Sequence, residues 1–566
     1  MEKRVCGLET EYALSFEARD SQLRNLDAGA IFGDIEAILP QTHLTLEADS
    51  FRRNPTGQHD AIAIKEGWFV ESGARCYYDA GHVEWATPET TSAQQAVLYE
   101  LAGDRTVLAL ARSVPMARRG RVMVIKNNVD YVHGHTYGCH ENYQVVRRRS
   151  AREDRAFFRM LVQQLTPFLV TRQIFCGAGK IGCADPQAAR TVGFQLSQRA
   201  DFIERELSPE TRAERAIINE RDESLSGQRY RRLHLIIGDS NLSPYASILK
   251  LGTTRITLHL IEQSALQHVP RLVDPIAALK AVSYDPTCRV LLPTVDGQCL
   301  SPIALQRLYL DTAQQVLREP DQATYQVLSM WQDTLDQLER DPLLLRDRLD
   351  WVAKQYYLFN PLLKQEMTTW EEVAAWSYVI DQLRCEDTAQ TGRPTSQQYA
   401  RYQHILQRHG LDWSAYEAQR QLYFQLRERD LRYHDLDSEY GLFALLQARN
   451  LMLRLYANEE AIVTACNHPP GDTRAVARAR VIRWAHETGR AAEVLLDWGR
   501  IQIGGGNPRI IQLDEPLELY EGMLDSVLRV LHGTDDQQDE IRLLGEVQCE
   551  LPPRGLRALL RRFMSR

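Results

Sequence analysis

Two glutamates near the start of the chain could hold a metal ion. Glu9 and Glu11 stand two residues apart in a segment that reads as a strand, and positions i and i+2 of a strand point to the same face. Leu8, Thr10 and Tyr12 would take the other face. Two adjacent carboxylates repel and lose hydration when covered, unless a cation neutralises them. A solvated sheet face explains the pair equally well, so these residues alone leave the choice open.

Three further segments supply side chains of the same kinds. Tyr77 and Asp79 would share one strand face, and His82 and Glu84 would share one after a short bend. Carboxylate oxygens with one or two imidazoles suit magnesium or manganese better than structural zinc. Strand phase does not decide between His140 and its neighbour Glu141. The candidates in the other two segments are Asp130, His133, His135, His140, Glu141 and Asn142, followed by His234 and Asp239.

The histidines allow a second interpretation. His133, His135 and His140 could together form a zinc site. We favour the interpretation that they belong to a polar loop that lines a cleft. Acidic oxygens at the ends of several strands indicate instead two or more magnesium ions, which bind through a few carboxylates and bridge the phosphates of a nucleotide.

Phosphates also need fixed cations, and arginine offers a planar donor fork for them. Each arginine taken alone is more often a surface or ion-pair residue. The segment CGAGK at 176–180 lacks the spacing of a Walker phosphate loop, so we do not interpret it as one. The candidate arginines are Arg221, Arg231, Arg232, Arg474 and Arg478.

The elements that must position these side chains change in character along the chain. The first 260 residues alternate short strands with helices, and an irregular stretch at 41–65 is expected to be a long loop. Helices dominate from about 302, interrupted by a polar segment at 386–398, and a smaller unit follows about 456. The expected strands are 4–14, 74–78, 121–125, 142–147, 194–196 and 233–237, with helices at 93–112 and 155–169. The smaller unit should contain a helix from about 473, strands near 493–503 and 510–513, and a closing helix.

Bulk composition excludes several classes of protein. The 566 residues suggest two to four domains. A net charge of −8 does not indicate the basic surface that nucleic-acid-binding proteins have. The ten cysteines form no C-x-x-C pair, which argues against a zinc ribbon. No apolar run reaches the ~20 residues of a membrane helix, and the opening segment lacks a secretion signal. The sequence therefore predicts a reduced cytoplasmic protein that binds neither nucleic acid nor a membrane.

Taken together, the motifs resemble those of the Pup ligase and depupylase family of carboxylate–amine ligases, which is related to glutamine synthetase and glutamate–cysteine ligase. They follow the family's order over most of residues 1–535. The motifs are GLETEY, YYDAGHVEWATPE, KNNVD, YGCHENY, FLVTRQIFCGAGK, QLSQRADFIE, AIINERDE, YRRLHLIIGDSN, LKLGTT, ALQRLYLD, TLDQLERDP, LDWVAKQ, LRYHDLD, PPGDTRA and MLDSV.

The resemblance implies an α+β fold with ATP and Mg²⁺ as cofactors. A glutamine-synthetase-like domain, a curved antiparallel sheet packed with helices, would span 1–457, with an insertion at about 359–403. A small C-terminal α/β domain with a basic tail would span 458–566. Monomers are favoured, although the sequence does not fix the oligomeric state.

The resemblance also implies roles for individual residues. Asp79 matches the family's catalytic aspartate. Of the metal ligands, Glu9, Tyr77 and Glu84 would surround one metal, and Glu11, His140 and His234 would serve a second region. Arg221, Arg474 and Arg478 would meet the nucleotide phosphates or the substrate carboxylate.

The implied substrate is a Pup-like protein modifier and its conjugates. Motifs such as LKLGTT and TLDQLERDP favour a depupylase or deamidase, whereas YGCHENY and LRYHDL favour a ligase that joins the modifier's C-terminal glutamate to lysines through a glutamyl phosphate. The interval between Glu9 and Asp79 is intermediate between the two types. We favour the hydrolase and keep three alternatives: the ligase, a family member that acts on another glutamate substrate, and an inactive ATP-binding scaffold.

Overall fold

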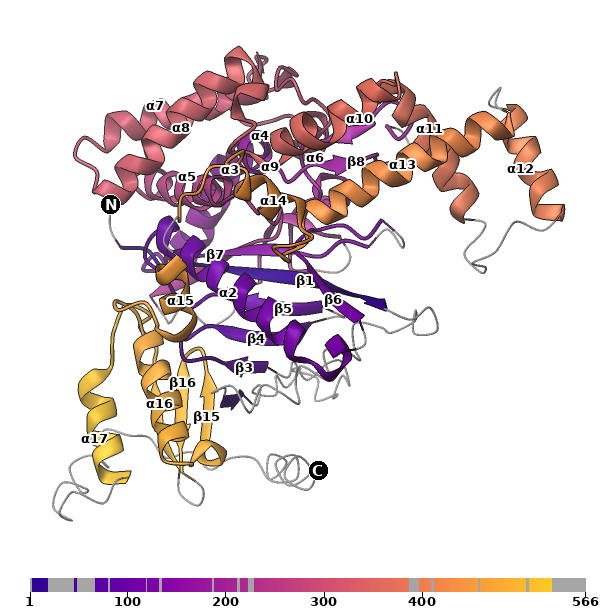
Figure 1. Cartoon of the computed structure of the whole chain (residues 1–566). Coiled ribbons are helices and arrows are strands. Elements are labelled where there is room, and N and C mark those ends of the chain that lie inside the picture. The colour runs from indigo at the N-terminus through magenta and orange to yellow at the C-terminus, as the bar shows by residue number, and fades with distance from the viewer. Residues whose placement is uncertain are drawn as a thin grey trace.

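A mixed ten-stranded sheet forms the centre of the protein (Figure 1). The computed structural model describes residues 3–18, 45–47, 67–79, 82–118, 120–131, 135–185, 188–210, 214–221, 229–385, 396–408, 412–456, 459–504 and 508–531. His133, the segment 386–395 and the basic tail lie outside the described residues, as does most of the expected loop at 41–65.

The strand order brings segments distant in sequence side by side. It runs β10 (Arg205–Ser208), β11 (Ala216–Asn219), β12 (Tyr230–Leu235), β7 (Cys139–Val146), β1 (Cys6–Ala18), β5 (His82–Ala86), β4 (Arg75–Asp79), β3 (Gly67–Phe69) and β2 (Thr45–Glu47), and β6 (Gly120–Ile125) pairs with the second half of β1. The α+β fold expected from the sequence is confirmed. Two details were wrong: β10 and β11 are parallel, and residues 45–47, expected in a loop, form an edge strand on β3.

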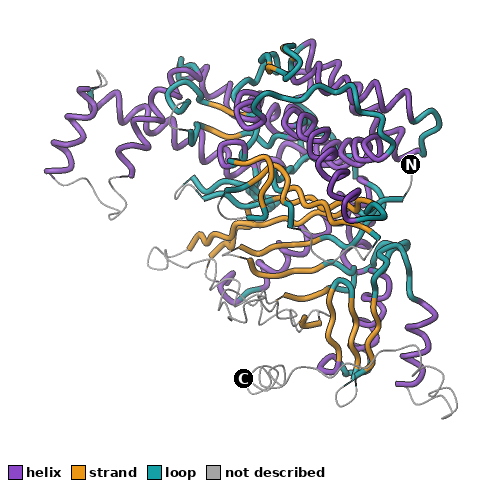
Figure 2. The backbone as a smooth tube through the Cα atoms, turned by 180° about the vertical axis from the view of Figure 1, so that it is seen from behind, coloured by secondary structure: helices purple, strands orange, loops and turns teal. Residues whose placement is uncertain are grey.

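One face of the sheet is apolar and packs against α2 (Ala93–Ser113). Leu8 and Tyr12 of β1 and Trp85 of β5 are at most 1% exposed on this side, as the alternation of a strand requires. A Cβ atom on Gly103 would lie 2.4 Å from the Trp85 indole, so glycine lets the helix approach. The helix begins at Ser92, whose side chain accepts the Gln95 N–H. In Figure 2 the strands lie in front of this helix.

Helices build the upper half of the molecule around α5 (Pro244–Glu262), which is buried along nearly its whole length. Its buried length includes the charged residues Lys250 and Arg255, which donate hydrogen bonds to the backbone carbonyls of Asp239 and Arg4. The helices α11–α13 extend to one side (Figure 1) and contain most of the expected insertion. The remaining helices are α3 (Ala151–Thr171), α4 (Gln173–Cys176), α6 (Pro275–Ser283), α7 (Pro302–Val316), α8 (Gln322–Arg340), α9 (Asp350–Ala353), α10 (Asn360–Gln365), α11 (Trp370–Cys385), α12 (Ser396–Arg408), α13 (Trp413–Tyr433), α14 (Leu442–Ala448) and α15 (Glu459–Asn467).

Short elements complete this half. A π-helix, Lys354–Phe359, continues α9 into α10. Two small antiparallel sheets pair β8 (Lys180–Ile181) with β9 (Phe194–Gln195) and β13 (Leu292–Pro293) with β14 (Cys299–Leu300). No helix in the described ranges is long and apolar enough to cross a membrane.

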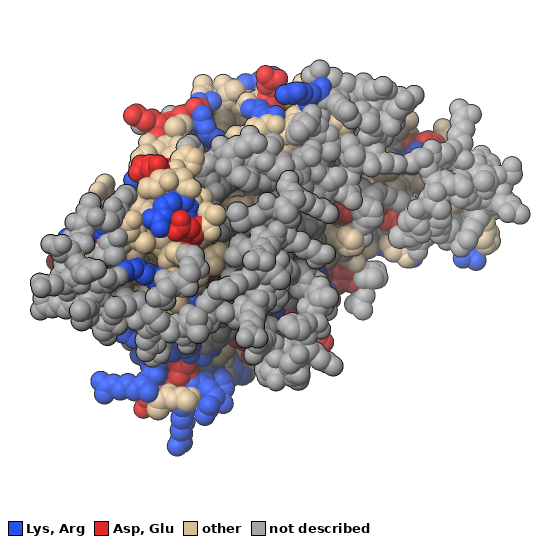
Figure 3. All heavy atoms as spheres, turned by 90° about the horizontal axis from the view of Figure 1, so that it is seen from below, with Lys and Arg blue, Asp and Glu red and all other residues tan. Residues whose placement is uncertain are grey.

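A smaller unit lies at the β2–β3 edge of the sheet (Figures 1 and 2). Its antiparallel sheet of β15 (Val494–Asp497), β16 (Arg500–Ile503) and β17 (Arg509–Gln512) packs with α16 (Ala475–Glu487) and α17 (Glu521–Leu531) around a separate apolar core. The preceding helix, α15, packs on α2 of the larger unit. On the face seen in Figure 3, Lys and Arg side chains of the described residues gather at the lower left, with a few Asp and Glu side chains beside them.

Buried ion pairs fasten the two units together. Glu89, which follows β5, accepts hydrogen bonds from Arg474 Nε at 2.6 Å and from Arg478 through two nitrogens, one at 3.1 Å. The Arg478 guanidinium also lies over the rings of Phe69 and Trp498, at 5.3 and 5.0 Å from their centroids. The arginines are 3% and 0% exposed, and both direct their guanidinium groups at this one carboxylate, whose charge offsets part of the cost of burying them.

Acid is expected to loosen this contact. Burial opposes ionisation of Glu89, but Arg478 and Arg474 outweigh it and hold its pKa at about 2, against an ordinary value of 4.5. A depressed folded-state pKa gives stability that is present above the unfolded value and is lost as pH falls from about 4.5 towards 2. Urea unfolding at pH 7, 4 and 3 should therefore show a steeper acid loss in the natural protein than in Glu89→Gln, which lacks this titration. Parallel losses in the two proteins would contradict the expectation.

Candidate functional site

The polar candidates of five adjacent strands share the other face of the sheet. Residues directly opposite in antiparallel strands point the same way, so the register can be followed from strand to strand. Across β12, β7, β1, β5 and β4 it pairs Asn142 with His234, His140 with Glu9, Glu11 with Glu84, Glu84 with Tyr77, and His82 with Asp79. Side chains contributed by residues 9 to 234 thus meet on one surface.

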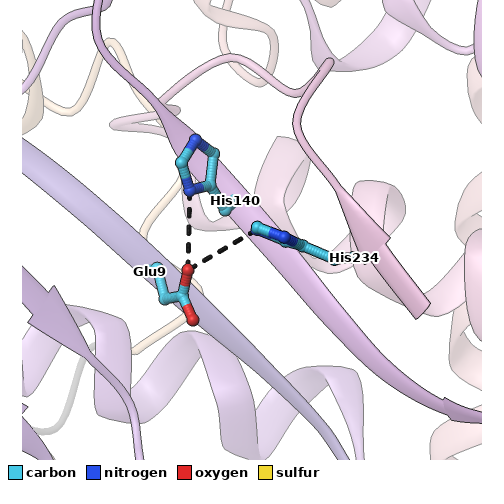
Figure 4. Close-up of side chains that lie close together, drawn as sticks. All are labelled: Glu9, His140 and His234. Carbon is cyan, nitrogen blue, oxygen red and sulfur yellow. Dashed lines mark ion pairs between the residues drawn. The ribbon is translucent and has the colours of Figure 1, made fainter. Parts of the chain in front are cut away.

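Three of these side chains form a cluster that could bind a metal ion (Figure 4). Glu9 Oε2 lies 3.5 Å from His140 Nδ1 and 3.7 Å from His234 Nε2. One potential ligand atom from each residue lies within 4.8 Å of the others. Both ring nitrogens of His234 are buried and lack a hydrogen-bond partner. A carboxylate with two imidazoles, one of them otherwise unsatisfied, fits a divalent ion.

The charge states of Glu9 and His234 favour binding of a cation. Burial opposes ionisation of Glu9, but Arg232, whose Nη2 donates to Glu9 Oε1 at 2.9 Å, holds the Glu9 pKa well below its usual range. Burial and Arg232 also lower the pKa of His234 well below 6.5. His234 is therefore a neutral imidazole with a free lone pair, the form that ligates metals.

A second polar group extends from Glu11 towards β4. Glu11 Oε2 lies 3.6 Å from His82 Nδ1, and Glu11 Oε1 lies 3.9 Å from His140 Nε2. The His82 ring packs on Tyr137 at 4.4 Å between centroids. Burial lowers the pKa of His82, and Glu11 and Asp79 oppose that effect. Asp79 therefore lies on the same polar surface as Glu11, at the β4 side.

The grouping of ligands differs from the one expected. His140 and His234 were expected with Glu11, whereas both approach Glu9, and His140 lies between the two glutamates. The reason is register, since Glu9 stands directly opposite His140. Burial raises the pKa of the Tyr77 hydroxyl, and the carboxylates of Glu84 and Glu9 raise it further, so both act on Tyr77.

The structure separates the remaining candidates. Glu141 points to the opposite face and pairs with Arg172. Asp239 is buried and accepts backbone N–H groups of the Gly-rich segment and of Gln198. Among the described residues, the group that could hold a metal ion consists of Glu9, His140 and His234 and does not include His135. This does not favour the interpretation of His133, His135 and His140 as a zinc site. A Cβ atom at Gly138 would lie 2.1 Å from His140 Nε2, so the close passage of this loop requires glycine.

A cavity opens beside Glu9, between the sheet and the smaller unit. Residues 5–9, residues 86–89, Trp498 and Pro516 line it. Glu9, Asn142 and Arg232 also line it, and Arg232 donates hydrogen bonds to the other two. A flat aromatic group could therefore sit near Trp498 with its anionic substituents directed towards Arg232 and the cluster.

The arginines have different positions. Arg474 lines the cavity, but Arg478 does not; it is buried against Glu89 and holds the units together. Arg221 is exposed after β11 and contributes to the low pKa of His234. Arg232, considered only as one of several cations, binds both Glu9 and Asn142. The sequence did contain a signal for this role. Arg232 stands two residues before His234, so the two side chains lie on the same face of the strand.

Comparisons with known proteins agree on one family. The family model described as "Pup-ligase protein" matches residues 4–381 and 363–502. The depupylase of Acidothermus cellulolyticus is 38% identical over 504 residues, covering 85% of this chain and 87% of that protein. The Pup–protein ligase of Corynebacterium diphtheriae is 31% identical over 552 residues, covering 94% and 95%.

Solved structures of a ligase are similar over most of the chain. The complex of prokaryotic ubiquitin-like protein Pup with its ligase PafA has a TM-score of 0.72 and 27% identity, covering 96% of this chain and 94% of that one. PafA in complex with ADP has a TM-score of 0.66 and 26% identity, covering 92% and 97%.

Proposed function

Since this chain belongs to the Pup-ligase family, we propose that it is an ATP- and Mg²⁺-dependent enzyme acting on the C-terminal Glu or Gln of Pup, chiefly in depupylation or deamidation. The observation that carries the proposal is the single polar sheet face on which Glu9, His140 and His234 meet, with Asp79 on the same surface. The free cysteines of the described residues fit a reduced cytoplasm, where ATP is available.

Nucleotide and metal have separate places in this proposal. The adenine ring would occupy the cavity beside Trp498, with Arg232 and Arg474 facing the phosphates. Glu9, His140 and His234 would hold Mg²⁺, with Glu11, Tyr77 and Glu84 nearby. Bound Mg²⁺ would neutralise the phosphate charge and polarise a phosphoryl oxygen. Arg221, exposed at the His234 side, would meet an anion only when substrate is bound.

Asp79 is the group we assign to the chemistry. In the hydrolase it would attack the isopeptide or amide carbonyl, or take a proton from the attacking water. In the ligase it would take the proton of the lysine amine as that nitrogen attacks the glutamyl phosphate. Either role requires an ionised carboxylate on the polar face, and the position at the end of β4 provides it with access to solvent.

The comparisons support two directions of reaction, with the hydrolase first. The depupylase of Acidothermus cellulolyticus, with the higher identity, favours the hydrolase. The fuller length match to the ligase of Corynebacterium diphtheriae favours a ligase as second candidate. Incubation with ATP, Mg²⁺ and Pup ending in Glu or Gln, with and without Pup conjugates, followed by intact-mass spectrometry, tests both. Release of Pup or conversion of Gln to Glu indicates the hydrolase, and addition of Pup to lysine indicates the ligase. If no mixture showed a change in mass, the proposed enzymatic activity on Pup would be refuted.

Replacing Glu9 tests the metal site. Glu9→Ala should weaken binding of ATP in Mg²⁺ on the order of 100-fold, because it removes the carboxylate shared by both histidines. Calorimetry with and without Mg²⁺ measures this, and the difference between the proteins should shrink without the ion. Glu17→Ala is the matched control, since Glu17 lies on the same strand but is 66% exposed beside Arg121. Equal affinities of Glu9→Ala and the control would contradict the assignment.

A further inference from the structure

Arg199 is a buried cation without an acidic partner. The residue is 2% exposed, and none of the ion pairs among described residues includes it. Its Nη1 donates to the Tyr137 carbonyl at 2.6 Å and to Thr136 Oγ1 at 3.2 Å, while its Nε is buried and unsatisfied. The cost of this burial lowers the Arg199 pKa to about 10. A guanidinium in such a place normally has a carboxylate or phosphate beside it.

A rigid turn holds Arg199 in position. The buried Asp239 carboxylate accepts the backbone N–H of Gln198 at 2.9 Å and of Arg199 at 3.2 Å, and also the Ser197 hydroxyl at 2.9 Å. These bonds fix the backbone, and the bonds that Nη1 donates to the Tyr137 carbonyl and Thr136 Oγ1 hold the guanidinium itself. The cation is therefore pre-organised, as a binding group should be.

The turn delivers Arg199 to the Glu11 end of the polar face. Tyr137, which accepts its hydrogen bond, packs on His82, and His82 lies 3.6 Å from Glu11. Glu11 and Arg215 are the charged residues with the largest influence on the Arg199 pKa. Arg215 is half-buried and also forms no ion pair within the described ranges. Arg215 is thus within electrostatic range of Glu11, although Glu204 has the larger effect on its pKa.

Their position differs from that of the nucleotide cavity. The cavity lies at the Glu9 end and is lined by Arg232 and Arg474, whereas neither Arg199 nor Arg215 lines it. Glu9 and Glu11 are two strand residues apart, about 7 Å. An anion bound by Arg199 would therefore lie on the Glu11 side of the nucleotide phosphates. The protein substrate would approach the site from that side.

We propose that Arg199, assisted by Arg215, binds the α-carboxylate of the modifier's terminal glutamyl residue. This inference rests on the proposed function. A terminal Glu, a terminal Gln and a glutamyl group linked to lysine through its side chain differ at the γ-carbonyl, but all three keep the same free α-carboxylate. A fixed arginine for that group would select a chain terminus over an internal Glu or Gln, and would aim the γ-carbonyl at Asp79 in either direction of the reaction.

The test compares Pup with a free terminal α-carboxylate and Pup with a terminal α-carboxamide, in whichever reaction the natural protein performs. For the natural protein the carboxamide should raise KM about 10- to 100-fold, the range for a hydrogen bond to a charged group. Arg199→Met should raise KM for the carboxylate form by a similar factor, abolish the discrimination, and leave the ATP affinity unchanged. Because methionine removes an unpaired buried charge, thermal stability should be kept or raised.

Arg205→Gln is the matched control, since Arg205 is a surface residue near Arg215 that pairs with Glu214; its KM values should match those of the natural protein. Discrimination retained by Arg199→Met would overturn the inference. Weaker ATP binding with an unchanged KM for Pup would overturn it too, in favour of a phosphate contact. If the natural protein neither processes Pup nor binds fluorescently labelled Pup in the presence of ADP and Mg²⁺, the proposed function fails first. Equal KM values for the two Pup forms refute only the role of Arg199.

Discussion

Asp79→Asn should lower kcat about 1,000-fold or more while ATP binds as in the natural protein, because a carboxamide keeps the shape but can neither accept a proton nor act as a nucleophile. Asp79 ends β4 opposite His82 and is partly exposed, so the replacement leaves the apolar core untouched. Turnover of a Pup conjugate, or conjugation if the chain is a ligase, gives kcat. Calorimetry with ATP and Mg²⁺ gives the affinity.

The separation of the two measurements is what identifies the role. Loss of turnover together with ATP affinity would mean that Asp79 serves the nucleotide site, and retained turnover would remove it from the chemistry. Glu71→Gln, in the turn between β3 and β4, removes one carboxylate from the same hairpin outside the site. Both its kcat and its ATP affinity should equal those of the natural protein.

Glu89→Gln should lower the free energy of unfolding by about 3–5 kcal/mol, the cost of breaking a buried ion pair from one side. Glu89 is the carboxylate on which both Arg474 and Arg478 converge, so its neutral form removes the charge that both buried cations contact. Urea unfolding followed by tryptophan fluorescence measures the change, and Trp498 beside Arg478 reports on the small unit.

A second substitution separates charge from packing. Arg478→Met in the Glu89→Gln background should recover part of the loss, because it removes one unpaired cation. The partly exposed pair Arg490–Glu493 provides the control, and Glu493→Gln should cost less than about 1 kcal/mol. Equal effects of Glu89→Gln and Glu493→Gln would show that the interface does not depend on the buried pair. A changed ATP affinity in Glu89→Gln would further indicate that the interface shapes the cavity lined by Arg474.

Local pattern and motif order were sufficient for the fold class and for the expectation that the candidate polar residues share sheet faces. Alternation along β1 places Glu9 and Glu11 on one face and Leu8 and Tyr12 on the other, and the burial of the latter pair agrees. The helices around residues 93–112 and 155–169 and the elements of the small unit follow from periodicity, which depends only on neighbours in sequence. The choice of His140 over Glu141 came from the family resemblance, and the two side chains do lie on opposite faces.

The sequence alone thus determined the family, the α+β architecture and the polar residues that could bind a divalent ion and a nucleotide. Only the tertiary structure decided how they associate: that His140 and His234 meet Glu9, that Arg478 joins Glu89 across 389 positions, and that Arg199 has no acidic partner among the described residues. The reason is physical. Which side a residue faces follows from strand alternation, but strand register and the pairing of distant charges depend on packing among segments that no local pattern relates.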